Sequence, residues 1–380
     1  MNEIACSDQN YHFSDDYKQA REKFLTAAKA NGATIETHVL EGFLGKDGET
    51  LATDVAWLGP KDAKRVVITI SATHGVEGFA GSAIQTGWFY SKERTAAPDD
   101  IALLAIHANN PYGFSWLRRF NEQNIDVNRN FINYENWPAN VGYTELAKTL
   151  CPEKWTPFVR FKTLLQLGLY NLKNGQSYTQ KASSGGQYYH HDAAKGFPDG
   201  AKGIFYGGRE ASWSRKTLLK ILNDKLSEAK FITVVDIHTG LGDYGTHVEI
   251  CNLKTRKQFD IAYEWYGETC QSPTFGEKPS VSTGNFGTCV AGIDDAFPGK
   301  LVTGFTLEYG TLPGRKVLNA VRADNWLQFH GDPSSDKGIA IKQQICDAFY
   351  CDNMIWKEYV YKTGIDALMK AFNGISKIAD

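Results

Sequence analysis

Several features that would place a protein in a membrane or outside the cell are missing from this sequence. The first residues, MNEIACSDQNYHF, contain neither a basic nor an apolar segment, so we expect no secretory signal. The longest apolar runs, such as RVVITISA, fall far short of the roughly 20 residues that a membrane-spanning helix requires. The seven cysteines include no Cys-x-x-Cys pair, a pattern that suits reduced thiols better than a disulfide framework. These absences predict a soluble cytoplasmic protein.

The sequence also lacks an excess of charge of either sign. Lys and Arg total 41 and Asp and Glu total 43, which gives a formal net charge of -2. Such a balance provides no general attraction to nucleic acid or to an anionic membrane, so we expect neither as a partner. At 380 residues and 42% hydrophobic content, the chain is long enough to bury a substantial core. No feature of the sequence predicts the oligomeric state.

Short apolar runs alternate with longer stretches of helical pattern. The runs are rich in β-branched residues and end in polar or turn residues, as buried strands do, and they cover residues 65–71, 101–108, 231–237 and 301–309. The helical stretches cover residues 81–92, 142–174, 213–229, 256–270, 315–330 and 337–375. This alternation predicts an α/β fold, a single domain over residues 1–380 with a mixed, mainly parallel central sheet flanked by helices.

The interval at about 134–213 departs from this alternation. It begins with helical pattern and continues into a segment rich in glycine and tyrosine, SSGGQYYHHDAAKGFPDGAKGIFYGGREAS. Long loops within compact domains are usually functional or inserted. We therefore predict an insertion of the same domain, and we hypothesise that residues 183–208 roof a site, which His190 and His191 could approach.

Ionisable side chains follow three of the four predicted strands. His74 and Glu77 come after the first, His238 ends the third, and Glu308 ends the fourth. Because sites in open α/β sheets lie at the carboxyl ends of the strands, we expect these side chains to converge. Two imidazoles and one carboxylate leave a tetrahedral position open on zinc, as in catalytic zinc sites. The sequence thus predicts one Zn2+ held by His74, Glu77 and His238, with Glu308 as the group that takes and returns a proton.

Each of these residues also has a structural explanation. A single His-x-x-Glu is common by chance, His238 could be a hydrogen-bonded core histidine, and Glu308 could pair with a buried arginine. Gly240, Gly242 and Gly245 spell the Gly-x-Gly-x-x-Gly of a dinucleotide-binding turn. That fingerprint requires a helix directly after it, whereas THVEICNL follows with strand-like alternation. The glycines are more consistent with a tight exit of the backbone from the strand.

Four motifs, taken in order, resemble those of the zinc carboxypeptidase superfamily, which includes carboxypeptidase A, aspartoacylase and succinylglutamate desuccinylase. They are HGVE (74–77), DVNRNF (126–131), DIHTG (236–240) and TLEYG (306–310). The stretches NPYGFSWLRRFNEQNIDVNRNF, IFYGG and DIHTGLGDYG resemble more closely a bacterial branch of that superfamily known only as a domain of unknown function. The resemblance implies a zinc carboxypeptidase-like fold over most of the chain.

The resemblance also implies roles for the Asp-x-Asn-Arg string. Asn128 and Arg129 would hold a substrate carboxylate, to which the planar guanidinium offers a two-pronged contact. Asp126 would accept a hydrogen bond from His74 and orient that imidazole on the metal.

An arginine upstream of this string would polarise the scissile carbonyl. Both Arg118 and Arg119 qualify, and Arg119 is slightly favoured; the interval to Asn128 is shorter than in carboxypeptidase A-like enzymes. The superfamily's mobile active-site tyrosine has no clear counterpart, and Tyr244 is a guess.

We therefore predict a zinc-dependent metallohydrolase that cleaves an amide bond next to a free carboxylate in a small peptide or an acylated amino acid. Three alternatives remain: an N-acyl amino acid amidohydrolase of the aspartoacylase type, a nucleotide-binding oxidoreductase and a non-catalytic metal-binding protein. The aspartoacylase branch usually continues its Asn-Arg pair with a Phe-Pro-Gly-like segment, where this chain has NRNFIN.

Overall fold

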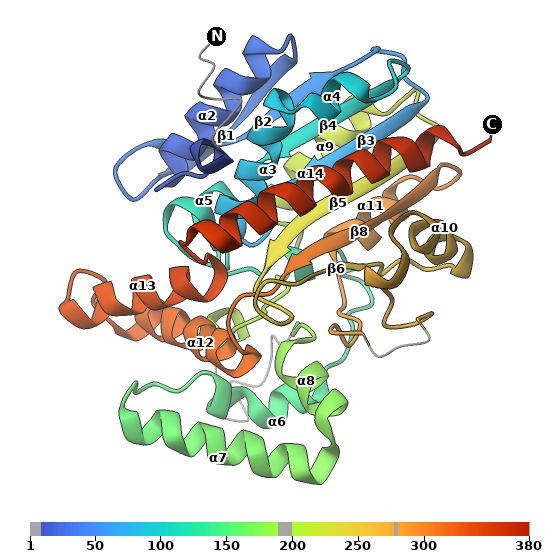
Figure 1. Ribbon diagram of the computed structural model, residues 1–380. Coiled ribbons are helices and arrows are strands. Elements are labelled where there is room, and N and C mark those ends of the chain that lie inside the picture. Colours follow the sequence, from blue (N-terminus) through green and yellow to red (C-terminus); the bar gives the residue numbers. More distant parts are fainter. Residues whose placement is uncertain (1–8, 189–199, 277–279, 380) are drawn as a thin grey trace.

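The centre of the molecule is a mixed sheet of eight strands. A computed structural model describes residues 9–188, 200–276 and 280–379, and the sheet has the strand order β1-β2-β4-β3-β5-β8-β6-β7 (Figure 1). In that order the strands are β1 (Thr34–Leu44), β2 (Thr50–Leu58), β4 (Ile101–His107), β3 (Arg65–Ile70), β5 (Phe231–Thr239), β8 (Leu301–Tyr309), β6 (His247–Ile250) and β7 (Cys270–Gln271).

The four central strands are the ones that the sequence predicts. β4, β3, β5 and β8 run parallel, while β1–β2, β2–β4 and β6–β8 pair antiparallel. Every residue of β4 and β5 is buried, which explains their uninterrupted apolar runs. The prediction of an α/β fold with a mixed central sheet is confirmed.

Thirteen α-helices of the described residues surround the sheet. They are α2 (Tyr17–Ala30), α3 (Gly78–Tyr90), α4 (Lys92–Ala96), α5 (Pro111–Ser115), α6 (Val141–Leu150), α7 (Pro157–Asn174), α8 (Gln176–Ser184), α9 (Trp213–Lys225), α10 (Arg256–Tyr266), α11 (Cys289–Ala296), α12 (Gly314–His330), α13 (Asp336–Phe349) and α14 (Met354–Ser376). α3 and α14 lie on one face of the sheet, and α9 and α11 lie on the other (Figure 1).

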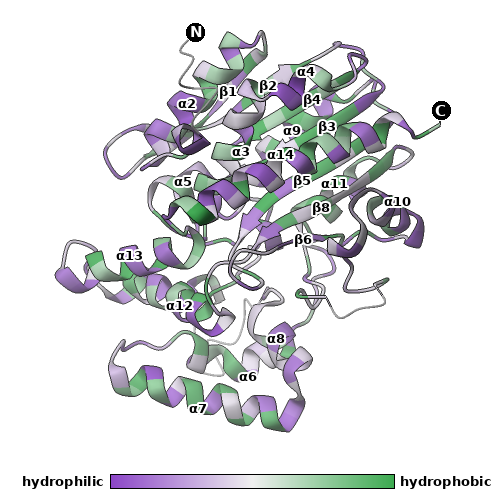
Figure 2. Cartoon of the chain, viewed as in Figure 1, coloured by the Kyte–Doolittle hydropathy of each residue, from purple (hydrophilic) through white to green (hydrophobic). Residues whose placement is uncertain are grey.

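The main core lies between the sheet and these helices. Twelve of the thirteen residues of α3 are buried, so this helix is apolar around most of its circumference, as a helix packed on several sides must be. The hydropathy colouring shows the central strands as predominantly hydrophobic (Figure 2). A second hydrophobic cluster joins α6, Phe205 and α8 to α12 and α13.

The described part of the interval at about 134–213 contributes a helical layer beyond the strand ends. Its predicted helical stretch 142–174 is divided into α6 and α7, because Pro152 interrupts the pattern and Thr156 caps a new helix that starts with Pro157. α6, α7 and α8 lie at the edge of the molecule towards which β5 and β8 point (Figure 1). The assignment of this layer as an insertion within a single domain remains a prediction.

No helix among the described residues combines the length and the apolar character needed to cross a bilayer.

Candidate metal centre and its cavity

His74 and Glu77 are brought to the site by a short turn after β3. His74 precedes the 3-10 helix η2 (Gly75–Glu77), which runs directly into α3. Gly75 lies so close to α5 that a Cβ atom there would come within 2.0 Å of the Gly113 carbonyl carbon. The HGVE motif therefore needs glycine at its second position, since any side chain would push the two turns apart.

His238 and Glu308 reach the same place from neighbouring strands. They are paired in register on the parallel strands β5 and β8, both buried at the carboxyl ends. Neighbouring residues in register point to the same face of a sheet. Strand pairing thus unites residues that lie 70 positions apart in the sequence.

Three side chains present ligand atoms to one point. His74 Nδ1 lies 2.9 Å from Glu77 Oε1 and 3.0 Å from His238 Nδ1, and His238 Nδ1 lies 3.2 Å from Glu77 Oε2. Among the described residues, these three form the one group of His, Cys, Asp or Glu with the spacing to hold a metal ion. Two imidazole nitrogens that face each other need a proton or a cation between their lone pairs, so this donor set fits a divalent metal.

A carboxylate lies behind each imidazole. His74 Nε2 is 3.2 Å from Asp126 Oδ1, and His238 Nε2 is 2.8 Å from Asp236 Oδ2. A proton on each Nε2, shared with its carboxylate, leaves each Nδ1 as an acceptor for a cation. Thr73 donates to the other oxygen of Asp236 over 2.8 Å and thereby fixes the carboxylate behind His238.

Arg119 borders this group, whereas Arg118 does not. The Arg119 guanidinium donates to Asp126 and Glu77 over 3.0 and 3.2 Å, and its Nη2 is 2.7 Å from His74 Nε2. A neutral imidazole that binds a cation through Nδ1 carries its proton on Nε2. His74 Nε2 could then no longer accept from Arg119, so metal binding and the Arg119–His74 contact exclude each other. Arg118 instead donates to Asp324 and Asn124, away from the cavity.

The buried charges shift one another's protonation. Burial alone would lower the pKa of His238, but Asp236 and Glu77 raise it well above its ordinary value. Burial alone would raise the pKa of Glu77 and of Asp126, but the adjacent cationic groups lower both. The surroundings of the two Nδ1 atoms therefore favour positive charge, as a metal site requires.

Glu308 is the second carboxylate of the site. Its Oε1 accepts the backbone N–H of Leu241 over 3.0 Å, and the residue lines the cavity. Burial and the negative charge of Glu77 raise the pKa of Glu308 to about 8, although His238 and Arg119 counteract them.

The Asp-x-Asn-Arg string forms the 3-10 helix η3 (Val127–Arg129) beside the cavity. Asp126 caps it by accepting the Asn128 N–H, and Asn128 Oδ1 accepts the backbone N–H of Cys289 over 2.7 Å. The Arg129 guanidinium donates to the carbonyl oxygens of Ser184 and Asn128. No carboxylate of the described residues lies within 4.0 Å of this buried guanidinium, so its charge has no direct anionic partner there.

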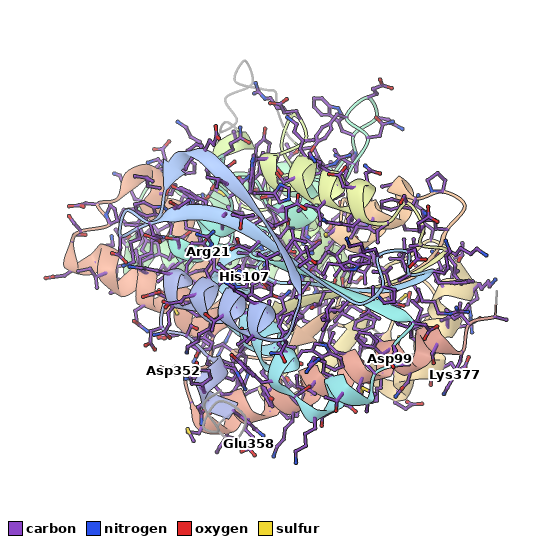
Figure 3. All side chains as sticks on the ribbon, turned by 90° about the horizontal axis from the view of Figure 1, so that it is seen from above. Arg21, Asp99, His107, Asp352, Glu358 and Lys377 are labelled. Carbon is purple, nitrogen blue, oxygen red and sulfur yellow. The ribbon has the colours of Figure 1, made fainter. Side chains whose placement is uncertain are left out.

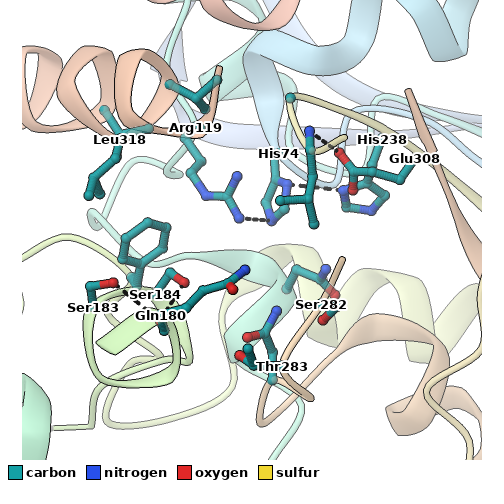
Figure 4. Close-up of a pocket in the computed structure, with 18 of the residues that line it drawn as sticks. His74, Arg119, Gln180, Ser183, Ser184, His238, Ser282, Thr283, Glu308 and Leu318 are labelled. Carbon is teal, nitrogen blue, oxygen red and sulfur yellow. Dashed lines mark hydrogen bonds between the residues drawn. The ribbon is translucent and has the colours of Figure 1, made fainter. Parts of the chain in front are cut away.

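These side chains line one cavity of about 760 Å3. His74, Arg119, His238 and Glu308 form one wall, and residues from α8 and from the segment before α11 face them (Figure 4). Apart from the two serines of the predicted roof, the sequence did not indicate this second wall, whose lining is largely uncharged and polar: Gln180, Ser183, Ser184, Asn252, Ser282 and Thr283. Such residues have no motif, and only the fold brings them opposite the metal ligands.

The structure does not bring every predicted residue into the cavity. Tyr244 is 52% exposed, donates to Asn353 Oδ1 and is not among the cavity-lining residues. Ser183, Ser184 and Phe205, from the two ends of the predicted roof, do line the cavity. His190 and His191 lie outside the described residues.

The glycine-rich turn after β5 does not lead into a helix. Gly240 has φ 108° and lines the cavity, and a Cβ atom there would come within 2.6 Å of Phe349. After Gly245 the chain enters β6, and the next α-helix begins at Arg256. The helix N-terminus that a dinucleotide fingerprint needs is therefore missing from this turn.

A family model matches most of the sequence. The family is described as "Protein of unknown function (DUF2817)", and the match covers residues 13–363. No curated protein matches the sequence.

Solved structures resemble the fold at low sequence identity. Thrombin activatable fibrinolysis inhibitor aligns with a TM-score of 0.51 at 11% identity, over 98% of this chain and 77% of the other. Carboxypeptidase A from Helicoverpa armigera aligns at 0.45 and 12% identity, over 90% and 76% of the two chains. Succinylglutamate desuccinylase from Chromobacterium violaceum aligns at 0.38 and 13% identity, over 87% and 74%. The first of these shows a shared fold.

Proposed function

The chain belongs to the DUF2817 family, and from the chemistry of its site we propose that it is a zinc-dependent hydrolase of the carboxypeptidase type. The substrate would be a small peptide or an acylated amino acid, cleaved at an amide bond next to a free carboxylate. The observation that carries this proposal is a metal-ligating group, a second carboxylate and an arginine that has no carboxylate partner within the described ranges, all lining one cavity.

His74, Glu77 and His238 would hold the metal through Nδ1, a carboxylate oxygen and Nδ1. When bound, zinc supplies Lewis acidity and lowers the pKa of water to about 7. With the metal bound, Asp126 and Asp236 would accept the protons of the two Nε2 atoms, which would keep both imidazoles in the tautomer that can bind a cation.

Glu308 would move the proton. It is a buried carboxyl group on the strand next to His238, and its Leu241 hydrogen bond holds one of its oxygens in place. A carboxylate at this position accepts a proton from the attacking water and delivers it to the nitrogen of the leaving amine.

Arg129 and Asn128 would hold the carboxylate of the substrate. Two of the three guanidinium nitrogens of Arg129 donate to Ser184 O and the third donates to Asn128 O, so the side chain is held rigidly at the cavity wall. Its lack of a carboxylate partner among the described residues leaves the charge available to an anionic ligand.

Arg119 would stabilise the negative charge that develops on the carbonyl oxygen. Its guanidinium lies beside His74 and Glu77, and Asp126 holds it from behind. Metal binding at His74 would release Arg119 Nη2 from its contact with His74 Nε2, and that donor would then be available to the carbonyl oxygen.

Metal analysis and paired assays test this proposal. The purified protein should contain about one equivalent of zinc by mass spectrometry, and it should hydrolyse dipeptides, N-acyl amino acids or both. Faster turnover of N-acyl amino acids would identify the amidohydrolase alternative. Retained NAD without metal would overturn the proposal in favour of a nucleotide-binding protein, and zinc without hydrolysis of either class would indicate a metal-binding protein.

We also propose a cytoplasmic location. The six described cysteines are all free thiols, as expected in a reducing compartment. Cell fractionation with the full-length chain would test it.

A further inference from the structure

The outward side of α7 is apolar. Six large hydrophobic residues of this helix are more than half exposed: Phe158 at 73%, Phe161 at 66%, Leu164 at 54%, Leu165 at 55%, Leu169 at 58% and Leu172 at 83%. We call these six residues the α7 apolar face. α7 lies at the lower edge of the molecule and carries strongly hydrophobic segments (Figure 2).

The arrangement is the reverse of that in an ordinary surface helix. The residues of the α7 apolar face recur three or four positions apart, so they share one side of the helix. The opposite side carries Thr163, which is buried, and Leu167 and Asn171, which line the cavity. Surface helices normally turn their polar side to water, so the α7 apolar face calls for a partner.

Exposed apolar residues of this kind are concentrated on α7. Elsewhere in the described parts of the chain, the aliphatic side chains that are more than half exposed occur singly or as one adjacent pair: Leu44, Val141, Ile339, Met354 and Ile355. Isolated exposed apolar residues are normal on protein surfaces, but six on one side of about four helical turns form a contiguous patch.

The charge around this patch has one sign. Residues 154–191 contain five Lys or Arg residues and no Asp or Glu, in a chain with a formal net charge of -2. Arg160, Lys162 and Lys173 are exposed on α7 itself. No carboxylate in the described ranges lies within 4.0 Å of these three cations, so they are available to an anionic surface.

The charge decides between two occupants. If α7 of one molecule packed against α7 of a second copy, exposed cations would lie at both margins of the contact with no acidic residue on either helix. An anionic lipid surface complements both the apolar face and the cations, which is the pattern of helices that lie in the membrane interface. With 18 residues α7 is about 27 Å long, and its three cations prevent it from spanning a bilayer.

We propose that α7 docks the protein on an anionic phospholipid surface, with the α7 apolar face inserted among the lipids. The docking is peripheral, and it does not depend on the proposed hydrolase activity. Because Leu167 and Asn171 line the cavity from the inner side of the same helix, docking would bring the cavity close to the membrane. The expectation of no membrane partner rested on the charge of the whole chain, which conceals this local basic segment.

Vesicle sedimentation with the full-length protein tests the proposal. Binding to vesicles with roughly one third phosphatidylglycerol should exceed binding to pure phosphatidylcholine vesicles by about tenfold, and it should weaken as salt rises. Phe161→Ser with Leu165→Ser should lower binding at least about tenfold, and Lys162→Glu with Lys173→Glu should do the same. The matched control, Phe43→Ser with Leu44→Ser, removes exposed apolar residues elsewhere and should bind like the original chain.

Three results would overturn this inference. The first is no binding to either vesicle. The second is equal binding to both vesicles, which would remove the role of the cations. The third is a dimer of the original chain in light scattering, together with no vesicle binding. If the Phe161→Ser, Leu165→Ser variant were then a monomer, a second copy would be the occupant of the α7 apolar face. Circular dichroism should be used to check that each variant is folded. If the serine variant does not fold, the Lys162→Glu, Lys173→Glu variant still tests the proposal.

Discussion

Arg118 and Arg119 are adjacent in the sequence and both are buried, yet they belong to two groups with different chemistry. Arg119 belongs to what we call the cavity cluster, which also contains His74, Glu77, Asp126 and His238. Arg118 belongs to the core ion cluster, which also contains Asn124, Asp324 and Lys342. Exposed fractions of 1% for Arg118 and 9% for Arg119 hardly distinguish the two.

The two clusters differ in what their partners can still bind. In the core ion cluster, Asp324 accepts from both Arg118 and Lys342, so its charge is compensated by two cations, one from the loop after α5 and one from α13. In the cavity cluster, two imidazole nitrogens face each other at the wall of a cavity. A buried charge therefore indicates function here only where ligand atoms remain directed at an open space.

The largest expected difference between the two regions concerns metal. His74→Ala or His238→Ala should lose the bound metal and lower turnover by at least about 10^4-fold, because the metal stabilises several kcal/mol of transition-state charge. Metal content by mass spectrometry and turnover by amine release measure this. Arg118→Met should retain about one equivalent of metal, and a metal-free Arg118→Met protein would contradict the distinction between the clusters.

The next effect separates metal binding from proton transfer. Glu308→Gln should retain the metal and lower kcat by about 10^2- to 10^4-fold, since the amide has a similar shape but cannot accept a proton. Metal content and steady-state kinetics on the same preparation distinguish the two functions. A fully active Glu308→Gln enzyme would refute the role given to Glu308, whatever the substrate.

The sequence predicted the parts of the fold whose environment is uniform. β3, β4, β5 and β8 are buried on both faces, so each appears as a run of apolar residues. β1 was not predicted, because it is an edge strand whose exposed and half-buried residues include two glutamates and a histidine, without regular alternation. β2 was not predicted either, although it is buried, since Thr53 and Asp54 interrupt its apolar run.

In the site, too, some residues could be predicted from local sequence patterns and others could not. Strand ends predicted the positions of His74, His238 and Glu308, because parallel strands bring their carboxyl ends to one edge of the sheet. The choice between Arg118 and Arg119 depends on a left-handed residue at Leu117, with φ 50°, and on Asp324, some 200 residues further along the chain. No local pattern contains that information.

The paired arginines provide a direct test of the comparison. Arg119→Met should lower kcat/KM per folded molecule by about 10^2- to 10^3-fold, as expected for a lost oxyanion donor. It should also lower the free energy of unfolding by about 3 kcal/mol, because it breaks the buried pairs with Asp126 and Glu77. Arg118→Met should leave turnover per folded molecule unchanged but lower the free energy of unfolding by about 3 kcal/mol, the lower end for a broken buried pair, because Lys342 still compensates Asp324. Urea unfolding and steady-state kinetics on both variants measure these effects, and equal losses of activity would remove the functional distinction between the clusters.

The smallest expected effect concerns a buried histidine outside both clusters. His107 is fully buried beside Ser82, close to Arg21 (Figure 3), and burial lowers its pKa to about 4, with Asp54 opposing the shift and Arg21 reinforcing it. His238 shows the opposite shift, because two carboxylates adjoin it. In the unfolded chain His107 titrates near 6.5, so only the unfolded chain binds this proton as the pH falls from 7 to 5. The free energy of unfolding should therefore fall by about 2 kcal/mol over this range because of His107. His107→Gln cannot titrate, so urea unfolding at the two pH values should show a loss smaller by that amount, with metal content unchanged. An identical pH dependence in the variant would show that burial does not set the protonation of His107, and the contrast with His238 would then fail.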